Sequence, residues 1–382
     1  MKHTSIIHKI ILILVPLSCT ISACLSTESK KQTDTAKGSP QDTLRVTLYF
    51  AGDIMMHLPQ VKAAMTGIDT YDLHDNYKYI SPYIKKADVA IANLETTFGG
   101  KPYRGYPQFS SPDTLAYALK DAGFDILTTA NNHSVDRGRN GIIRTLDILD
   151  KVGIKHLGTY RDSIERSNNH PLNITINGIK LAFLCYTYGT NGISIPPPTV
   201  VNLIDSMMLD EVRTIKAKAE TDFTIICIHW GNEYQRKEDD SQKRLAQSLL
   251  DAGADVIIGS HPHVVQSAYH YSDTATSKSS LVVYSLGNYI SNQTKDPATR
   301  GGLSTICTLQ KLSNGTKSIP NVEYLHTWVS KGIEDGRKRY RIIPITYTER
   351  DTSLIPSYEH KEFLRYTQYS KSIVLSDSLP PF

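Results

Sequence analysis

Apolar residues along the chain gather in short runs, most of which have the length of buried β-strands. Runs rich in Val, Ile, Thr and Tyr predict strands at 45–52, 88–93, 125–130, 173–176, 180–187, 223–230, 255–260 and 281–287. Between them, amphipathic segments predict helices at 111–123, 141–153 and 241–253. Strands that alternate with helices predict an α/β fold (α+β layered), in which helices pack on the outside of the sheets.

The predicted helices all end at a glycine, where a left-handed cap costs little, and Ser111 or Asp113 is the expected cap of the first. The pattern changes after about residue 295, where apolar runs are joined by polar turns and predict strands without helices. We expect these C-terminal antiparallel strands to complete a second sheet. The final Leu-Pro-Pro-Phe segment is expected to form a surface tail.

The N-terminal segment has the pattern of an export signal. Basic residues precede the apolar run 10–17, and Ile21-Ser22-Ala23 then leads into Cys24. This ending resembles a bacterial lipobox, in which the cysteine is lipidated, and Cys19 is the competing position. The alternative is an uncleaved anchor helix. Both interpretations place the protein outside the cytoplasm, in the cell envelope.

These features predict four segments: a lipoprotein signal peptide (1–23), the lipidated Cys24 with a flexible tether (24–43), a main domain (44–295) and a β-rich C-terminal extension with a tail (296–382). Across the 382 residues, 40% are hydrophobic and 21% charged, enough for a buried core. A net charge of +4 without a block of basic residues excludes nucleic acid as an expected partner. The cysteines Cys185, Cys227 and Cys307 fall inside apolar runs, which predicts buried strand positions and no disulfide.

Residues that ligate metals follow five of the predicted strands. In chain order, these residues are Asp53 and His57; Asn93 and Glu95; Asn131, Asn132 and His133; His229; His261 and His263. Because active sites collect beyond the carboxyl ends of strands in α/β sheets, we expect these side chains to converge on one edge of the sheet. Nitrogen and oxygen ligands without thiolate favour a pair of zinc, manganese or iron ions.

Each position also has a structural interpretation. An Asp after a strand is often a turn or cap residue, Asn131-Asn132 is compatible with a turn, and His229 with core packing. His261-Pro262-His263 is harder to explain by packing alone. The joint placement of all the residues favours the metal site.

The segments that carry these residues resemble a known family over Leu44–Tyr289. AGDIMMH, ANLETTF, TTANNHSVDRGRNGI, IHWGNEY, DAGADVIIGSHPHVVQ and VYSLGNYI are similar to the successive blocks of the CapA-type capsule (poly-γ-glutamate) synthesis family. That family is similar in fold to the calcineurin-like metallophosphoesterases. The resemblance therefore implies a metallophosphoesterase-like two-sheet β-sandwich flanked by helices.

The resemblance also implies roles for individual residues. Asp53 and His263 would hold one metal ion, with His57 as a further ligand or a substrate-facing group. Glu95 would bridge to a second ion, in place of the aspartate that phosphoesterases use. The ligands of that second ion would be Asn132, His229 and His261.

Beside the metals, the resemblance implies that His133 is a general acid or oxyanion stabiliser. Asp136 would orient His133, or cap the following helix. Further candidates for substrate binding are Asn93, Asn288 (or a turn cap), Trp230 and Tyr234 (or packing), and Arg300 as a carboxylate clamp.

Three functions are compatible with this set. The first is a metal-dependent hydrolase or transferase that acts on an anionic surface polymer such as poly-γ-glutamate, or on its precursor. The second is a periplasmic metallophosphoesterase. The third is a non-catalytic accessory subunit of a polymer synthase or export complex. In each case the N-terminal lipid would hold the protein at a membrane.

Overall fold

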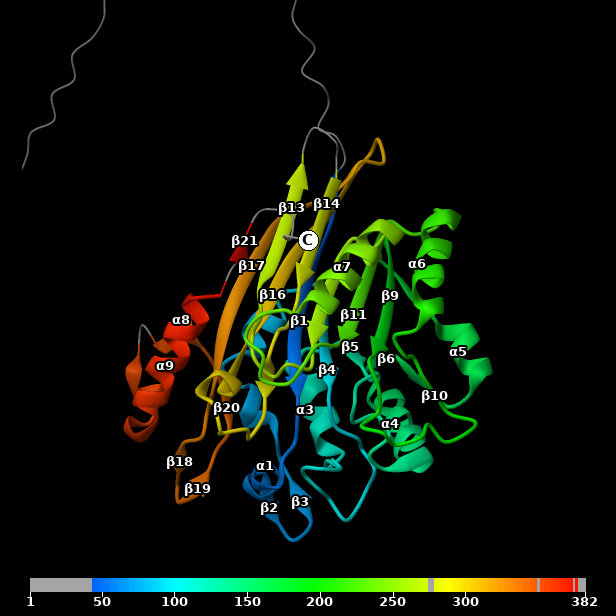
Figure 1. Cartoon of the computed structure of the whole chain (residues 1–382). Coiled ribbons are helices and arrows are strands. Elements are labelled where there is room, and N and C mark those ends of the chain that lie inside the picture. Colours follow the sequence, from blue (N-terminus) through cyan, green and yellow to red (C-terminus); the bar gives the residue numbers. More distant parts are fainter. Residues whose placement is uncertain (1–42, 274–277, 349–350, 374, 377–382) are drawn as a thin grey trace, which may run out of the picture. The chain divides into compact units, whose positions relative to one another are not determined.

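The strands of the computed structural model form an eight-stranded and a seven-stranded sheet (Figure 1). The structure describes residues 43–273, 278–348, 351–373 and 375–376. The predicted signal peptide, Cys24, the tether up to residue 42 and the C-terminal tail lie outside the described residues. Among the described helices, none is long and apolar enough to cross a membrane.

The first sheet has the strand order β20-β17-β16-β1-β4-β5-β6, with β15 paired to β1. Its strands β1, β4, β5, β6 and β15 run parallel to one another, and β16, β17 and β20 continue the sheet in antiparallel fashion. The bounds are β1 (Thr43–Ile54), β4 (Val89–Leu94), β5 (Ile126–Thr128), β6 (Lys155–Leu157), β15 (Asn288–Ile290), β16 (Gly301–Leu312), β17 (Lys317–Ser330) and β20 (Arg341–Pro344).

The second sheet has the order β21-β13-β14-β12-β11-β9-β8, with a parallel centre from β9 to β14. The bounds are β8 (Leu172–Ile176), β9 (Ile179–Thr187), β11 (Phe223–His229), β12 (Val256–Ser260), β13 (Ala268–Asp273), β14 (Lys278–Val283) and β21 (Leu375–Ser376). Three small ribbons pair β2 (Met65–Gly67) with β3 (Thr70–Tyr71), β7 (Thr159–Tyr160) with β10 (Val200–Val201), and β18 (Ile333–Glu334) with β19 (Arg337–Lys338).

The helices pack on the outer faces of the two sheets (Figure 1). The α-helices are α1 (Leu58–Ala63), α2 (Ser81–Ile84), α3 (Thr114–Ala122), α4 (Gly138–Val152), α5 (Ser163–Asn169), α6 (Ser206–Lys218), α7 (Asp240–Ala252), α8 (Ile345–Thr348) and α9 (His360–Lys371). Short 3-10 turns occupy η1 (His74–Tyr77), η2 (Pro297–Arg300), η3 (Thr352–Leu354) and η4 (Ser357–Glu359). Helices α3, α4 and α7 each end at a glycine with positive φ, as the sequence predicts.

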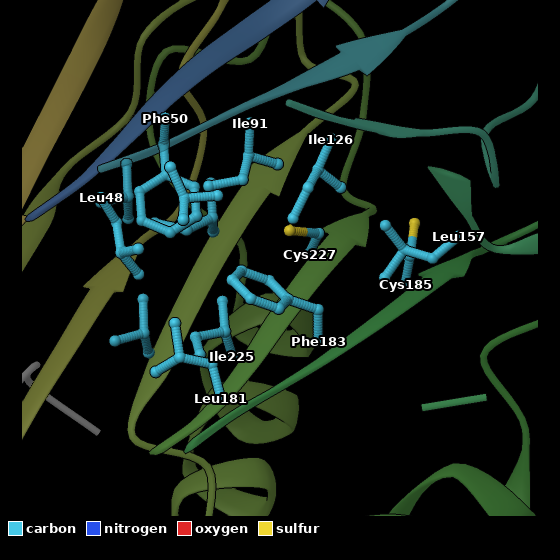
Figure 2. Close-up of a cluster of buried hydrophobic side chains, with 14 of the residues drawn as sticks. Leu48, Phe50, Ile91, Ile126, Leu157, Leu181, Phe183, Cys185, Ile225 and Cys227 are labelled. Atoms are coloured by element: carbon cyan, nitrogen blue, oxygen red, sulfur yellow. The ribbon is translucent and has the colours of Figure 1, made fainter. Parts of the chain in front are cut away.

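The main hydrophobic core lies between the two sheets (Figure 2). Leu48 and Phe50 of β1 point into this core, whereas Tyr49 of the same strand joins a second cluster beneath α3. On β11, Ile225 faces the same inter-sheet core and Ile226 faces α6 and α7. This alternation is the period of a pleated strand buried on both faces. The predicted two-sheet fold with helices outside is therefore confirmed.

The cysteine prediction is also confirmed. Cys185, Cys227 and Cys307 are buried, unpaired strand residues that all lie in the inter-sheet core, where Figure 2 labels the first two. Apolar surroundings raise the pKa of the Cys185 and Cys307 thiols to about 12, so that both remain protonated and unreactive.

Three details of the prediction are wrong. The C-terminal strands complete the first sheet, because β16 pairs with β1 along eight residues from Thr43 to Phe50. The region after 295 is not free of helices, since α8 and α9 pack on the end of that sheet around Trp328. Asp113 stands at the cap position of α3 but makes no capping hydrogen bond, because its carboxylate pairs with Arg144.

Candidate metal centre

The candidate ligands come together where the carboxyl ends of strands from both sheets meet. Asp53 ends β1 and Glu95 follows β4 in the first sheet, whereas His229 ends β11 in the second. His261 and His263 follow β12 of the second sheet. The expectation of a single sheet edge is thus corrected: the site lies between two sheets, and the apolar pattern of a strand does not reveal to which sheet it belongs.

Two groups of side chains in the described part of the chain have the arrangement of a metal site, and they share one residue. Ligand atoms of Glu95, His261 and His263 lie within 4.8 Å of one another, as do those of Asp53, Glu95 and His229. The Oε1 atom of Glu95 lies 3.7 Å from Nε2 of His229 and 3.8 Å from Nε2 of His263. Glu95 therefore stands between one histidine from the end of β11 and one from the loop after β12.

Asp53 is held by the strand beneath it. The register of β1 against β4 shifts between Ala51 and Asp53, and such bulges re-aim side chains next to active sites. Gly52 permits this, because a Cβ atom at that position would lie 2.0 Å from the carbonyl oxygen of Gly287. Asn93 then donates a hydrogen bond of 2.8 Å to Oδ1 of Asp53, which leaves Oδ2 toward Nδ1 of His263 at 3.1 Å.

The loop that carries the two histidines is strained and clamped. His261 and His263 have φ values of 102° and 58°, a region that non-glycine residues seldom occupy. The backbone N–H of Tyr234 donates to the carbonyl of Pro262 between them, at 2.8 Å. Strain of this kind persists where the surrounding structure fixes it, and it clusters at functional sites.

The side-chain amide of Asn132 faces His229. Its Oδ1 atom lies 3.0 Å from Nε2 of His229, and its Nδ2 group donates to Oδ1 of Asn191 at 3.3 Å. The other ring nitrogen of His229 lies 3.2 Å from the Ser260 hydroxyl. Asn132 therefore lies where an amide oxygen and an imidazole nitrogen can meet one ion.

Burial sets the protonation of the cluster. It raises the pKa of the Glu95 carboxyl well above its ordinary value, and the neighbouring Asp53 charge acts in the same direction. Burial lowers the pKa of His229 well below its usual range and that of His261 to about 3. The histidines are therefore neutral, which is the form that binds metal, and a divalent cation would offset the cost of burying the carboxylates.

His133 and Asp136 form a pair beside the ligands. Nδ1 of His133 lies 2.8 Å from Oδ2 of Asp136, which also accepts a 2.6 Å hydrogen bond from the backbone of Phe109. The ring of Phe109 packs edge-on against His133, with 4.7 Å between centroids. Because Nδ1 is engaged, Nε2 is the ring nitrogen that can exchange a proton with a substrate.

The other predicted residues are distributed around this centre. His57 is in neither ligand group of the described residues: it precedes α1, and its Nδ1 accepts a hydrogen bond from the Asn292 backbone at 3.2 Å. Tyr234 is 47% exposed at the rim, with its ring 6.0 Å from that of His263. Asn93 is buried and bonded to Asp53, which makes it a support for a ligand.

Three predicted substrate contacts have other partners in the structure. Trp230 is buried, stacks on Tyr284 and donates its indole N–H to the Tyr284 carbonyl, which is packing. Asn288 is buried and donates both amide protons to Gln293 and Thr299. The guanidinium of Arg300 lies against Trp328 and pairs with two glutamates of the C-terminal region, so it is not free to clamp a substrate.

The sequence analysis missed Tyr188 and Phe109. Tyr188 is 46% exposed, and its ring lies 4.6 Å from that of His261 and 6.2 Å from that of His229. Because Tyr188 directly follows β9, the strand-end rule that found the ligands also applied to it. Phe109 contacts both His57 and His133 from a long loop, and no sequence pattern points to it.

Comparison with known proteins gives relatives of one kind. The chain is 29% identical over 271 residues to the capsule biosynthesis protein CapA of Bacillus anthracis, covering 66% of this chain and 62% of that protein. It is 28% identical over 294 residues to the PGA biosynthesis protein CapA of Bacillus subtilis (strain 168), covering 75% and 73%. Among solved structures, a 5'-nucleotidase from Candida albicans aligns with a TM-score of 0.41 and 11% identity, over 85% of this chain and 57% of that one.

A family profile matches the part of the chain that holds the ligands. It is described as "Bacterial capsule synthesis protein PGA_cap" and matches residues 47–293, which span both sheets and every candidate ligand from Asp53 to His263. The match agrees with the resemblance on which the ligand prediction was based. The chain therefore belongs to the bacterial capsule synthesis protein family.

Proposed function

We propose that this protein is a lipid-anchored, extracytoplasmic, metal-dependent hydrolase or transferase. Its substrate would be an anionic surface polymer of the poly-γ-glutamate type or a precursor of it, handled together with polymer synthase or export subunits. Family membership supports the link to capsule synthesis. The lipobox-like sequence before Cys24 supports the location at a membrane.

The observation that carries the proposal is the state of Glu95. Its side chain is 0% exposed, and neither carboxylate oxygen has a hydrogen-bond partner among the described residues. A buried carboxylate left in this condition costs free energy unless a cation compensates it. Asp53, His229 and His263 surround Glu95 at ligand distance, so the donor set fits divalent cations.

We propose two ions, with Glu95 as the shared ligand. Asp53 and His263 would hold one ion, and Asn132, His229 and His261 the other. Mn, Zn or Fe suits such oxygen and nitrogen donors. When bound, the ions would supply a Lewis acid and a water of lowered pKa.

The remaining chemistry belongs to the side chains of the protein. His133 would hold a proton at Nε2 and deliver it to the oxygen or nitrogen that leaves the scissile bond, because Asp136 fixes the opposite nitrogen. The side chains of Tyr188 and Tyr234, both about half-exposed, would line the approach of the chain to the ligands.

Elemental analysis of the purified full-length protein tests the metal proposal. We expect about two transition-metal ions per chain, and their loss in a His261→Ala, His263→Ala double variant that stays folded. A His74→Ala, His156→Ala variant is the matched control, because both histidines pair with surface aspartates. Wild-type protein without metal after supplementation would contradict the proposal.

Substitution of His133 tests catalysis. His133→Asn should keep the metal but lower turnover of a poly-γ-glutamate substrate by ~100-fold or more, the usual contribution of a general acid. Asp136→Asn should act in the same direction by favouring the wrong tautomer. Unchanged turnover in both would contradict the catalytic role. Turnover of aryl phosphates with polymer untouched would instead identify a phosphoesterase.

A further inference from the structure

A second cavity lies outside the metal centre and has a distinct chemistry. It is an open cavity of about 550 Å³, bordered by α1, the start of the β2–β3 ribbon, and the β18–β19 hairpin. Three cationic side chains line it, Lys62 from α1 and Arg337 with Lys338 from β19, and no carboxylate does. The rest of the wall is Pro59, Ala63, the 43% exposed Met65, Thr66 and Gly67.

The charges in this cavity are not neutralised by the described residues. Lys62, Arg337 and Lys338 are exposed and make no ion pair within the described part of the chain. Among the acids nearby, Glu334 bonds to Arg341 and Asp69 pairs with Lys101 at 2.9 Å, while Asp335 is exposed at the turn of the same hairpin. Three like charges around one cavity repel one another, and an anionic ligand would relieve this repulsion.

Both walls of the cavity begin beside the metal centre. His57 directly precedes α1, and the Asn292 backbone N–H donates to its ring at 3.2 Å. Tyr340 follows the β18–β19 hairpin and donates its hydroxyl to Oδ1 of the same Asn292 at 2.9 Å. Asn292 thus connects the two walls at this end.

A fourth basic side chain stands at this junction. Lys331 precedes the hairpin and is 8% exposed, and its Nζ atom has one long hydrogen bond, 3.5 Å to the carbonyl of Gln293. Burial lowers the pKa of Lys331 to about 7, and a nearby anion would favour its charged form.

We infer that the cavity is a binding subsite for the carboxylates of an extended polyanionic chain whose reacting segment lies at the metal centre. This inference rests on the proposed function. The six residues of α1 span about 9 Å, which about two γ-linked residues can cover, because each has two more backbone atoms than an α-linked residue. The mixed wall of cations and aliphatic groups matches a chain whose carboxylates are separated by methylene groups. Lys62, Arg337 and Lys338 are then specificity residues that hold the polymer beyond the reaction point.

Binding of labelled oligomers to the full-length protein tests this inference, with a chelator present so that metal contributes nothing. Fluorescence anisotropy would compare a decamer of γ-linked glutamate with the same γ-linked decamer in which every α-carboxylate is an amide (isoglutamine). We expect wild-type protein to prefer the glutamate decamer by ~10-fold or more. The Lys62→Gln, Arg337→Gln, Lys338→Gln triple variant should bind it ~10- to 100-fold more weakly and with less dependence on salt.

The matched control is Lys151→Gln, Lys155→Gln, Arg365→Gln, which removes the same charges from exposed positions elsewhere. It should bind within about twofold of wild type. Equal losses in the two triple variants would mean attraction by net charge and would overturn the inference, as would unchanged binding in the cavity variant. A loss confined to phosphatidylglycerol vesicles, with decamer binding unchanged, would overturn it in favour of a lipid surface.

The outcome is separable from that of the proposed function. Because the chelated protein has no metal, binding at the cavity does not depend on the ligands or on turnover. If the purified wild-type protein contains no metal but binds the decamer in a charge-dependent way, the subsite is supported and the metal-dependent enzyme is contradicted. If the wild-type protein contains metal and is active, but the Lys62, Arg337, Lys338 triple variant binds the decamer normally, the enzyme is supported and the subsite is contradicted.

Discussion

Two glutamates in this protein, Glu95 fully buried and Glu211 partly buried, have opposite surroundings. Glu211 of α6 accepts hydrogen bonds from Arg166 at 2.6 Å and from the Tyr186 hydroxyl at 2.5 Å, and lies 3.0 Å from His170. These partners lower the pKa of Glu211 to about 2 although burial opposes them. Glu95 lies among three histidines and an aspartate, yet neither of its oxygens has a hydrogen-bond partner among the described residues.

The comparison separates a structural network from a ligand site. Around Glu211, each hydrogen-bond donor has an acceptor, and this hydrogen-bond network links α5, α6 and β9. Around Glu95, the neighbouring groups are imidazoles and a carboxylate, which are all metal ligands, and a cation would satisfy them together. A buried polar cluster therefore indicates a ligand site when its polar atoms lack hydrogen-bond partners. The following variants test this difference, from the largest expected effect to the smallest.

Replacing Glu95 by Gln should have the largest effect, and on metal binding. We expect metal affinity to fall by more than the ~100-fold that can follow loss of an outer-shell partner. In chelator, the free energy of unfolding should not fall by more than ~1 kcal/mol, because the amide is neutral and can donate to His229 or His263. Competition with a chelator and urea unfolding of the same protein measure the two quantities. Retention of full metal affinity would refute the shared-ligand role.

Replacing Glu211 by Gln should have the reverse pattern. The free energy of unfolding should fall by ~1–3 kcal/mol at neutral pH, because Arg166 and His170 lose a charged, partly buried hydrogen-bond partner, and metal content should not change. Since the folded pKa is lowered from 4.5 to about 2, wild-type Glu211 stabilises the fold above pH 4.5. This contribution is lost as the pH falls from 4.5 toward 2, and the variant should lack it. Urea unfolding between pH 3 and 7 checks both points.

How far the sequence could predict this fold depends on what each segment buries. Strands such as Phe223–His229 are buried on both faces and read as unbroken apolar runs, so their positions were predictable. Sheet membership was not, because the pairing of β1 with β16 joins residues more than 250 positions apart. Helix α9 escaped prediction because it follows a run of strands and buries only Tyr366 and Ser370.

For the site, the sequence predicted the candidate metal ligands. Asp53, Glu95, His229, His261 and His263 stand at strand ends, and the structure brings them together. The sequence could not show that Arg300 and Trp230 serve packing and not substrate binding. Polar and aromatic residues near a site have both roles, and only their contacts distinguish packing from substrate binding. The ligand roles themselves stay predictions until the metal is measured.

Substitution of Asp113 by Asn should have the smallest effect. Its carboxylate forms a two-pronged pair with Arg144, both contacts 2.7 Å, but the two side chains are 32% and 39% exposed. Water already solvates both charges, so we expect a loss of only ~0.2–1 kcal/mol, smaller still in 1 M salt. Asp113 makes no capping hydrogen bond, so no further loss should come from α3. Thermal or urea unfolding at two salt concentrations measures this. A loss of stability near that of Glu211→Gln would mean that burial does not determine how much each carboxylate contributes to the free energy of unfolding. The contrast between Glu95 and Glu211 would then need another cause.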